Sequence, residues 1–184
     1  MTLSPRFFAI AVLWTGSASA LADETQATII GGIGTRFLGS EDPRRGVGFA
    51  LSVLRPERQA NFRGYRGEVK YEVNFLTSTS PGLYEYDADR TEGYGALALY
   101  RLSRYREGQG IYLEAGLGAQ YSTQATHDAR LQLNTTPTFG AGYRFRTGGR
   151  AVELGVRYYH VSNGGRKNPN GGQNWLFATV SVSF

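Results

Sequence analysis

The chain contains no cysteine, which excludes a disulfide framework and any metal site built on thiolates. After Ala22 it also lacks any apolar run long enough to cross a bilayer as a helix. There is no basic helix and no cluster of basic and aromatic residues on one element, so nothing suggests a nucleic-acid partner. The mean hydropathy of −0.34 is an average that also arises when lipid-facing and interior-facing residues alternate along barrel strands.

The N-terminus has the three parts of a signal peptide for export. Arg6 supplies the positive charge, residues 7–14 are apolar, and small residues up to Ala22 offer a cleavage site. We therefore expect residues 1–22 to be a signal peptide and residues 23–184 to form one exported domain. Cleavage removes Arg6, one of the 20 basic residues, and leaves 19 against 15 acidic ones, a mild positive balance that fits contact with anionic lipid.

The rest of the chain divides into strand-like runs in which apolar and polar residues alternate. In one of them, Val152, Leu154 and Val156 alternate with Glu153 and Arg157, so one face is apolar and the other is charged. The pattern predicts an all-β fold, an eight-stranded antiparallel transmembrane β-barrel of the cell outer membrane. The expected strands are 27–38, 45–56, 65–76, 91–104, 109–122, 132–146, 149–162 and 173–184.

The polar faces of these runs predict a charged barrel interior in which opposite charges pair. Its expected members are Glu68, Lys70, Glu72, Glu114, Arg144, Glu153 and Arg157. The 12 tyrosines and ten phenylalanines fit aromatic girdles at the two membrane interfaces. We expect Tyr159 and Trp175 in these girdles rather than at a substrate site.

Connection lengths predict the orientation of the barrel, because outer loops are long and periplasmic turns are short. The connections expected outside the cell are 39–44, 77–90, 123–131 and 163–172. The last run has an apolar residue at every second position up to Phe184, which resembles the C-terminal assembly signal of outer-membrane barrels. A soluble β-sandwich is the alternative fold, and the terminal Phe together with the signal peptide favours the membrane barrel.

Three polar residues, His160, Ser162 and Asn174, share the apolar face of the last two runs. A spanning strand takes about 9–11 residues, and this count places all three at the outer interface, at the depth of lipid acyl esters. Neighbours across a hairpin lie about 5 Å apart, so the three side chains meet outside the barrel. A histidine can take the proton of a serine, and a third group can hold the imidazole in the useful tautomer. The trio therefore predicts an esterase.

The same segment resembles the PagL-type lipid A 3-O-deacylase family. The matching residues are Tyr159-His-Val-Ser-Asn163, Gly164-Gly165, Lys167, Pro169-Asn170 and Gly172. The resemblance implies His160 as general base and Ser162 as nucleophile, with the Gly165 amide and the Asn170 side chain as oxyanion donors. It also implies hydrolysis, without metal or cofactor, of the 3-linked acyl ester of lipid A, the lipopolysaccharide anchor in the outer leaflet.

The chain departs from the family pattern at Asn174, where the family has Glu. An asparagine can orient a histidine but cannot stabilise the imidazolium by charge, which implies a slower or an inactive enzyme. Glu41 or Asp42, on an outer loop, would be the substitute carboxylate. Arg166 and Lys167 flank the trio and are candidates to bind lipid A phosphates, or are solvated loop charges.

Other interpretations remain open from the sequence. His127 and Asp128 are adjacent, which makes a poor metal site, and a solvated loop is expected there. The rival functions are a structural or adhesive small barrel of the OmpA kind, an inactive relative that still binds lipid A, and a palmitoyltransferase of the PagP kind. The last takes acyl chains into its interior, whereas the trio here points outward. A homodimer is compatible with the sequence.

Overall fold

The structure is a computed structural model that describes residues 23–36, 40–41, 43–80, 90–168 and 170–184. The expected signal peptide, residues 1–22, lies outside the described residues. The strands are β1 (Glu24–Thr35), β2 (Arg45–Phe62), β3 (Tyr65–Thr79), β4 (Arg90–Arg106), β5 (Gln109–Ser122), β6 (Leu133–Thr135), β7 (Thr138–Thr147), β8 (Arg150–Val161) and β9 (Gln173–Ser183). Within the described ranges, no helix is long and apolar enough to cross a membrane.

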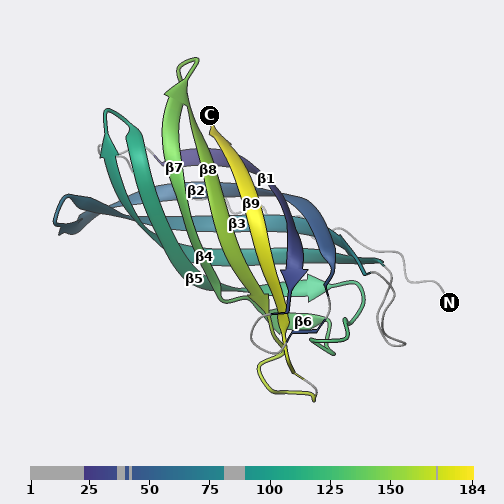
Figure 1. Cartoon of the computed structure of the whole chain (residues 1–184). Helices are drawn as coiled ribbons and strands as arrows, with labels where there is room; N and C mark the ends of the chain where they lie inside the picture. The colour runs from purple at the N-terminus through teal and green to yellow at the C-terminus, as the bar shows by residue number, and fades with distance from the viewer. Residues whose placement is uncertain (1–22, 37–39, 42, 81–89, 169) are drawn as a thin grey trace.

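The strands form one antiparallel sheet that closes into a barrel (Figure 1). Their order is β4-β3-β2-β1-β9-β8-β7-β5-β6, and β4 also pairs with β5. β6 and β7 are two pieces of one strand, because both continue a single register against β5, with Ala119 opposite Thr135 and Gly116 opposite Thr138. The break falls at Pro137, which has no N–H to donate to a ladder. The nine stretches therefore make an eight-stranded barrel, which confirms the predicted fold class and divides the expected strand 132–146 in two.

The two ends of the barrel differ in their connections. At one end, the turn end, two-residue turns join β2 to β3, β4 to β5 and β7 to β8. Gly148 and Gly149 in the last of these have φ of 58° and 78°, the left-handed conformation that such tight hairpins require. The longer connections, including 123–132 and 162–172, lie at the opposite end, the loop end, which is at the bottom of Figure 1.

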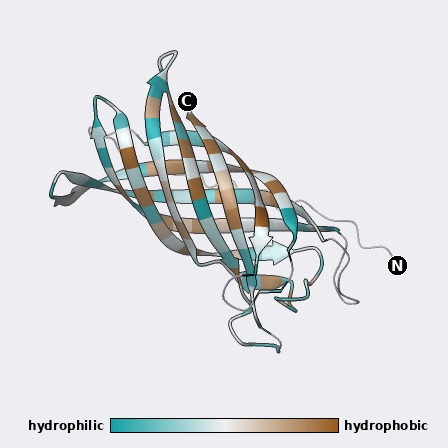
Figure 2. Ribbon diagram, in the orientation of Figure 1, coloured by the Kyte–Doolittle hydropathy of each residue, from teal (hydrophilic) through white to brown (hydrophobic). Residues whose placement is uncertain are grey.

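The outward-facing wall is apolar, and Figure 2 shows hydrophobic and hydrophilic residues alternating along the strands. Large apolar side chains more than half exposed on this wall include Ile29, Val47, Phe49, Val73, Leu117, Phe139 and Val156. Exposure of this size and continuity is unusual for a protein surrounded by water and is expected for a surface surrounded by lipid. The predicted apolar-out parity is therefore confirmed.

Ion pairs fill the middle of the interior. Arg101 donates to Glu153 at 2.8 Å through Nη1 and to Glu114 at 2.9 Å through Nη2. Arg157 donates to Glu72 at 2.6 Å and to Glu114 at 2.9 Å. The remaining expected inner charges, Glu68, Lys70 and Arg144, face the same interior, toward this cluster or the mouth at the turn end. The predicted interior network is confirmed, and Arg101 is a further member that the expected set did not include.

Toward the loop end the interior becomes apolar. The rings of Trp175 and Phe177 stack with centroids 5.2 Å apart, and Tyr159 meets Phe177 edge-on at 5.9 Å. Tyr159 and Trp175 are 1% and 5% exposed, so their expected place in membrane girdles is wrong. Each occupies an inward position between two outward-facing neighbours, and the side-chain alternation of the strand decides its direction.

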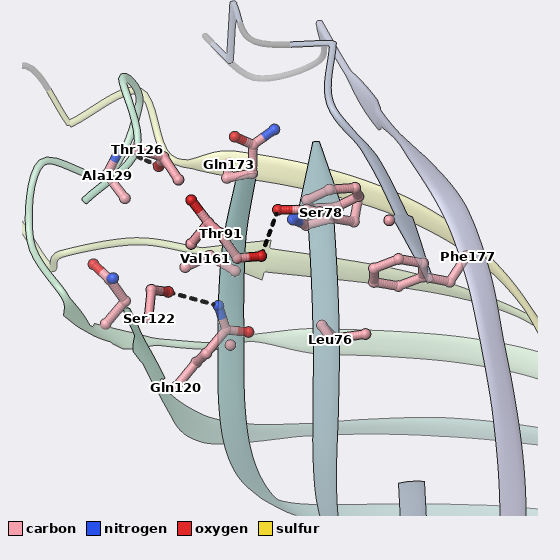
Figure 3. A pocket seen from close by; sticks show the side chains of 14 residues that line it. Leu76, Ser78, Thr91, Gln120, Ser122, Thr126, Ala129, Val161, Gln173 and Phe177 are labelled. Atoms are coloured by element: carbon pink, nitrogen blue, oxygen red, sulfur yellow. Dashed lines mark hydrogen bonds between the residues drawn. The ribbon is translucent and has the colours of Figure 1, made fainter. Parts of the chain in front are cut away.

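A small cavity lies beside this aromatic cluster, near the loop end of the barrel (Figure 3). Its volume is about 30 Å³. Polar side chains line part of it, with Gln120 donating to Ser122 at 3.0 Å and Ser78 donating to the Thr91 carbonyl at 3.4 Å. A space of this size holds a water molecule or two and has no room for an acyl chain.

Candidate active site

The three predicted site residues lie where β8 ends and β9 begins, at the loop end. His160 and Asn174 are directly opposite each other in the β8–β9 ladder, and Ser162 follows β8 by one residue. All three have the parity of outward-facing positions such as Val156 and Leu176, which are 54% and 46% exposed. The structure therefore brings the trio together on the outer wall of the barrel, as the residue count from the two strand ends predicts.

Asn174 holds the imidazole of His160 in one orientation. The Nδ1 atom of His160 lies 2.6 Å from Oδ1 of Asn174. An amide oxygen only accepts hydrogen bonds, so this contact fits the neutral tautomer in which Nδ1 donates and Nε2 keeps its lone pair. This is the tautomer in which a histidine can take a proton through Nε2.

Ser162 is held by the loop that follows it. Its hydroxyl donates to Oδ1 of Asn170 at 3.1 Å and accepts from the Gly164 N–H at 3.2 Å. The Asn163 N–H also donates to Oδ1 of Asn170 at 3.1 Å, which identifies the amide oxygen as the atom that faces Ser162. Within the described residues no hydrogen bond joins Ser162 to His160, so attack requires the hydroxyl to turn from Asn170 to Nε2. Such tightening on substrate binding is common in catalytic pairs.

Gly172 contacts the histidine ring, a role that sequence reasoning missed. Its φ is +70°, and a Cβ at this position would lie 2.2 Å from Cε1 and 2.9 Å from Nε2 of His160. Its N–H donates to the Asp128 carbonyl at 3.1 Å, which ties it to the loop after β5. Any residue with a Cβ at this position would clash with the imidazole ring of His160, so the site requires glycine. The spacing of the motif does not indicate this contact.

Two buried polar side chains connect the loops around the site. Asn163, 0% exposed, donates through Nδ2 to the carbonyls of Ala129 at 2.6 Å and Lys167 at 2.7 Å. The Asp128 carboxylate accepts from the Ser40 hydroxyl at 2.8 Å and the Glu41 N–H at 3.0 Å. Asp128 is 3% exposed, so the expectation of a solvated loop is wrong for this residue. Its carboxylate satisfies donors from a segment far away in the sequence.

The other predicted residues lie around the trio. Glu41 Oε2 is 3.7 Å from Nε2 of His127, so this carboxylate points toward His127 and not toward His160. Asp42 lies outside the described residues. Gly165 is exposed with φ +77°. Arg166 donates through Nε to the Asn163 carbonyl at 2.7 Å, and Lys167 is exposed. In the described part of the chain, no three His, Cys, Asp or Glu side chains form a group that could hold a metal ion.

Comparison with known proteins identifies the family. A family model described as lipid A 3-O-deacylase (PagL) matches residues 57–183, more than half of the chain. The chain belongs to the PagL lipid A 3-O-deacylase family. It is therefore a bacterial outer-membrane protein. That the loop end faces outward, as the connection lengths predict, stays a prediction. No curated protein matches the chain.

Two solved structures share the barrel architecture. The outer membrane enzyme PagL superposes with a TM-score of 0.64 at 18% identity, covering 87% of this chain and 98% of that one. Neisserial surface protein A (NspA) superposes with a TM-score of 0.52 at 16% identity, covering 88% of this chain and 97% of that one. At these identities the two structures support the fold alone.

Proposed function

We propose that the protein hydrolyses the ester that links an acyl chain to the 3-position of lipid A, with Ser162 as nucleophile and His160 as general base. The observation that carries the proposal is the hydrogen bond from His160 Nδ1 to Asn174 Oδ1 on the lipid-facing wall. It leaves Nε2 free, two residues before a serine on the same face. Because His160 and Ser162 have the parity of outward-facing positions, they do not take part in the ion-pair network inside the barrel.

The reaction has two steps. Ser162 Oγ gives its proton to His160 Nε2 and attacks the ester carbonyl carbon, forming a tetrahedral oxyanion. His160 then gives this proton to the 3-oxygen of the sugar as the C–O bond breaks, which frees the 3-hydroxyl and leaves the acyl group on Ser162. Water, deprotonated by His160, attacks the acyl-enzyme, and His160 returns the proton to Ser162 Oγ as a 3-hydroxy fatty acid is released. The scheme needs no metal ion and no cofactor.

The loop after β8 is suited to stabilise the oxyanion. Gly164 and Gly165 have positive φ values of 66° and 77° and no atom near their Cβ position, so their backbone can approach a substrate closely. In this proposal the Gly165 N–H and the NH₂ group of Asn170 donate to the oxyanion. Asn170 also holds Ser162 before the attack, since its oxygen accepts from the hydroxyl. Arg166 and Lys167, on the same loop, bind the lipid A phosphates.

A barrel without enzymatic activity is the second candidate. It is favoured by Asn174, which offers no negative charge to the imidazolium. A palmitoyltransferase of the PagP kind is disfavoured, because the small cavity beside the aromatic cluster has no room for an acyl chain.

Mass spectrometry of lipid A tests the proposal. The protein is expressed in an outer membrane with fully acylated lipid A, and Ser162→Ala in the same host is the matched control. We expect the wild-type protein to remove one 3-hydroxyacyl chain and the variant to remove none. Unchanged lipid A in cells with a correctly folded wild-type barrel would contradict the proposal and favour the inactive barrel.

A further inference from the structure

A tyrosine outside the predicted trio reaches the same oxygen atom as the histidine. The hydroxyl of Tyr158 donates to Oδ1 of Asn174, which also accepts from His160 Nδ1 at 2.6 Å. Tyr158 precedes His160 by two residues on β8 and so shares its outward face. Its partner in the β8–β9 ladder is Leu176, which makes Asn174 its diagonal neighbour, within reach of an aromatic side chain.

The two donors matter because an asparagine amide has two different ends. If the amide turned over, its NH₂ would face His160, and Nδ1 would have to accept. The ring proton would then lie on Nε2, and His160 could not take a proton from Ser162. A carboxylate at the same position has no such ambiguity, because both of its oxygens only accept. A chain with Asn174 therefore needs a device that keeps the amide oxygen toward the histidine.

We propose that Tyr158 is this device, a positioning residue that sets the tautomer of His160 through Asn174. A phenol donates a hydrogen bond more readily than it accepts one, because its oxygen lone pair is delocalised into the ring. Its hydroxyl therefore favours the orientation of the Asn174 amide in which the oxygen, and not the NH₂ group, points toward both Tyr158 and His160. Asn174 is 0% exposed, so water does not compete for this choice. The inference rests on the proposed role of His160 as general base.

The test combines Tyr158→Phe with a direct reading of the histidine tautomer. Nitrogen-15 NMR of the ring in detergent micelles is unambiguous in a His127→Gln background, because the chain has two histidines. We expect the Nδ1–H tautomer to dominate in the parent and the Nε2–H tautomer to gain in Tyr158→Phe. The loss of one hydrogen bond should lower kcat roughly three- to tenfold with KM unchanged. Tyr143→Phe, an outward-facing tyrosine 48% exposed on β7, should change neither measurement.

A carboxylate at position 174 separates positioning from packing. In an Asn174→Glu background, Tyr158→Phe should change kcat by less than about twofold, since a carboxylate presents an acceptor to His160 in any orientation. An equal loss of kcat in both backgrounds, or an unchanged tautomer in Tyr158→Phe, would overturn the inference. If the wild-type protein has no deacylase activity, the proposed function fails, and the NMR measurement alone still decides whether Tyr158 sets the tautomer.

Discussion

Strand β8 carries two polar clusters on opposite sides of the barrel wall, and they differ in charge. Glu153 and Arg157 point inward and join ion pairs of 2.6–2.9 Å with buried partners. His160 and Ser162, with Asn174 on β9, point outward, and their mutual contacts use neutral groups. Inside, every charge needs a counter-charge because burial makes an unpaired ion costly. Outside, lipid makes any permanent charge costly.

Along β8, the inward-facing charges stabilise the barrel, and the outward-facing polar residues are the ones proposed to carry out the reaction. The inner cluster is held by several ion pairs, since Arg157 donates from both terminal nitrogens to Glu72 and Glu114. In the outer cluster, Asn174 holds His160 and Asn170 holds Ser162, while within the described residues no hydrogen bond joins histidine to serine. The inner ion pairs stabilise the barrel, whereas under the proposed mechanism the Ser162 hydroxyl leaves Asn170 for His160 when a substrate binds.

Removing the proposed nucleophile or the proposed base should have the largest effect on activity. Ser162→Ala and His160→Ala should each lower lipid A deacylation by about 10³-fold or more. Neither change should alter the heat-modifiable migration of the barrel on gels, because both side chains lie outside the packed interior. A variant with near wild-type activity would show that the assigned pair is wrong. Loss of folding in both would show that the residues are structural.

The inner cluster should respond in the opposite way. Arg157→Met leaves the carboxylates of Glu72 and Glu114 buried without this cation and should cost about 3–5 kcal/mol of unfolding free energy. Deacylation per folded molecule should stay unchanged. The measurement is urea unfolding in micelles, with Arg55→Met as control. The Arg55–Asp23 pair is exposed to solvent, so this control should leave the unfolding free energy nearly unchanged. Equal costs would contradict the role of the network.

Gly172→Ala tests whether the histidine ring needs the space that glycine leaves. A Cβ here would lie 2.2 Å from His160 Cε1, so the ring must move. A displacement of about 1 Å can cost about 10²-fold in rate, and we expect a loss of kcat of that order with the barrel still folded. Gly149→Ala has a similar φ of +78° with no atom within 4 Å of its Cβ position, so it controls for backbone strain. Equal losses in both variants would attribute the effect to strain.

The barrel was predictable from the sequence because its signal is periodic. Alternation gave the outward wall and the inner charges, and counting residues along two strands placed His160 opposite Asn174. Tyr159 and Trp175 lie inside the barrel, because the parity of a strand position, and not aromatic composition, decides which way a side chain points. Asp128 is buried for a different reason. Its hydrogen bonds join loops that are distant in the sequence. The contact of Gly172 with the imidazole depends on the conformation of a loop, which no repeating sequence pattern predicts.

The smallest expected effect concerns the charge that the outer cluster lacks. Asn174→Glu should raise the rate, because a carboxylate beside Nδ1 stabilises the imidazolium that forms when Ser162 is deprotonated. Against this gain stands the cost of burying a charge, because Asn174 is fully buried and a carboxylate there depends on neighbouring donors for stabilisation. His160 and Tyr158 would both donate to the new carboxylate, since both already donate to Asn174 Oδ1. We therefore expect a gain of several-fold in kcat, measured on purified lipid A in detergent, together with a loss in Asn174→Ala. An alanine variant as fast as the wild-type protein would show that Asn174 is a spectator, and the search for an orienting group would move to Glu41 and Asp42.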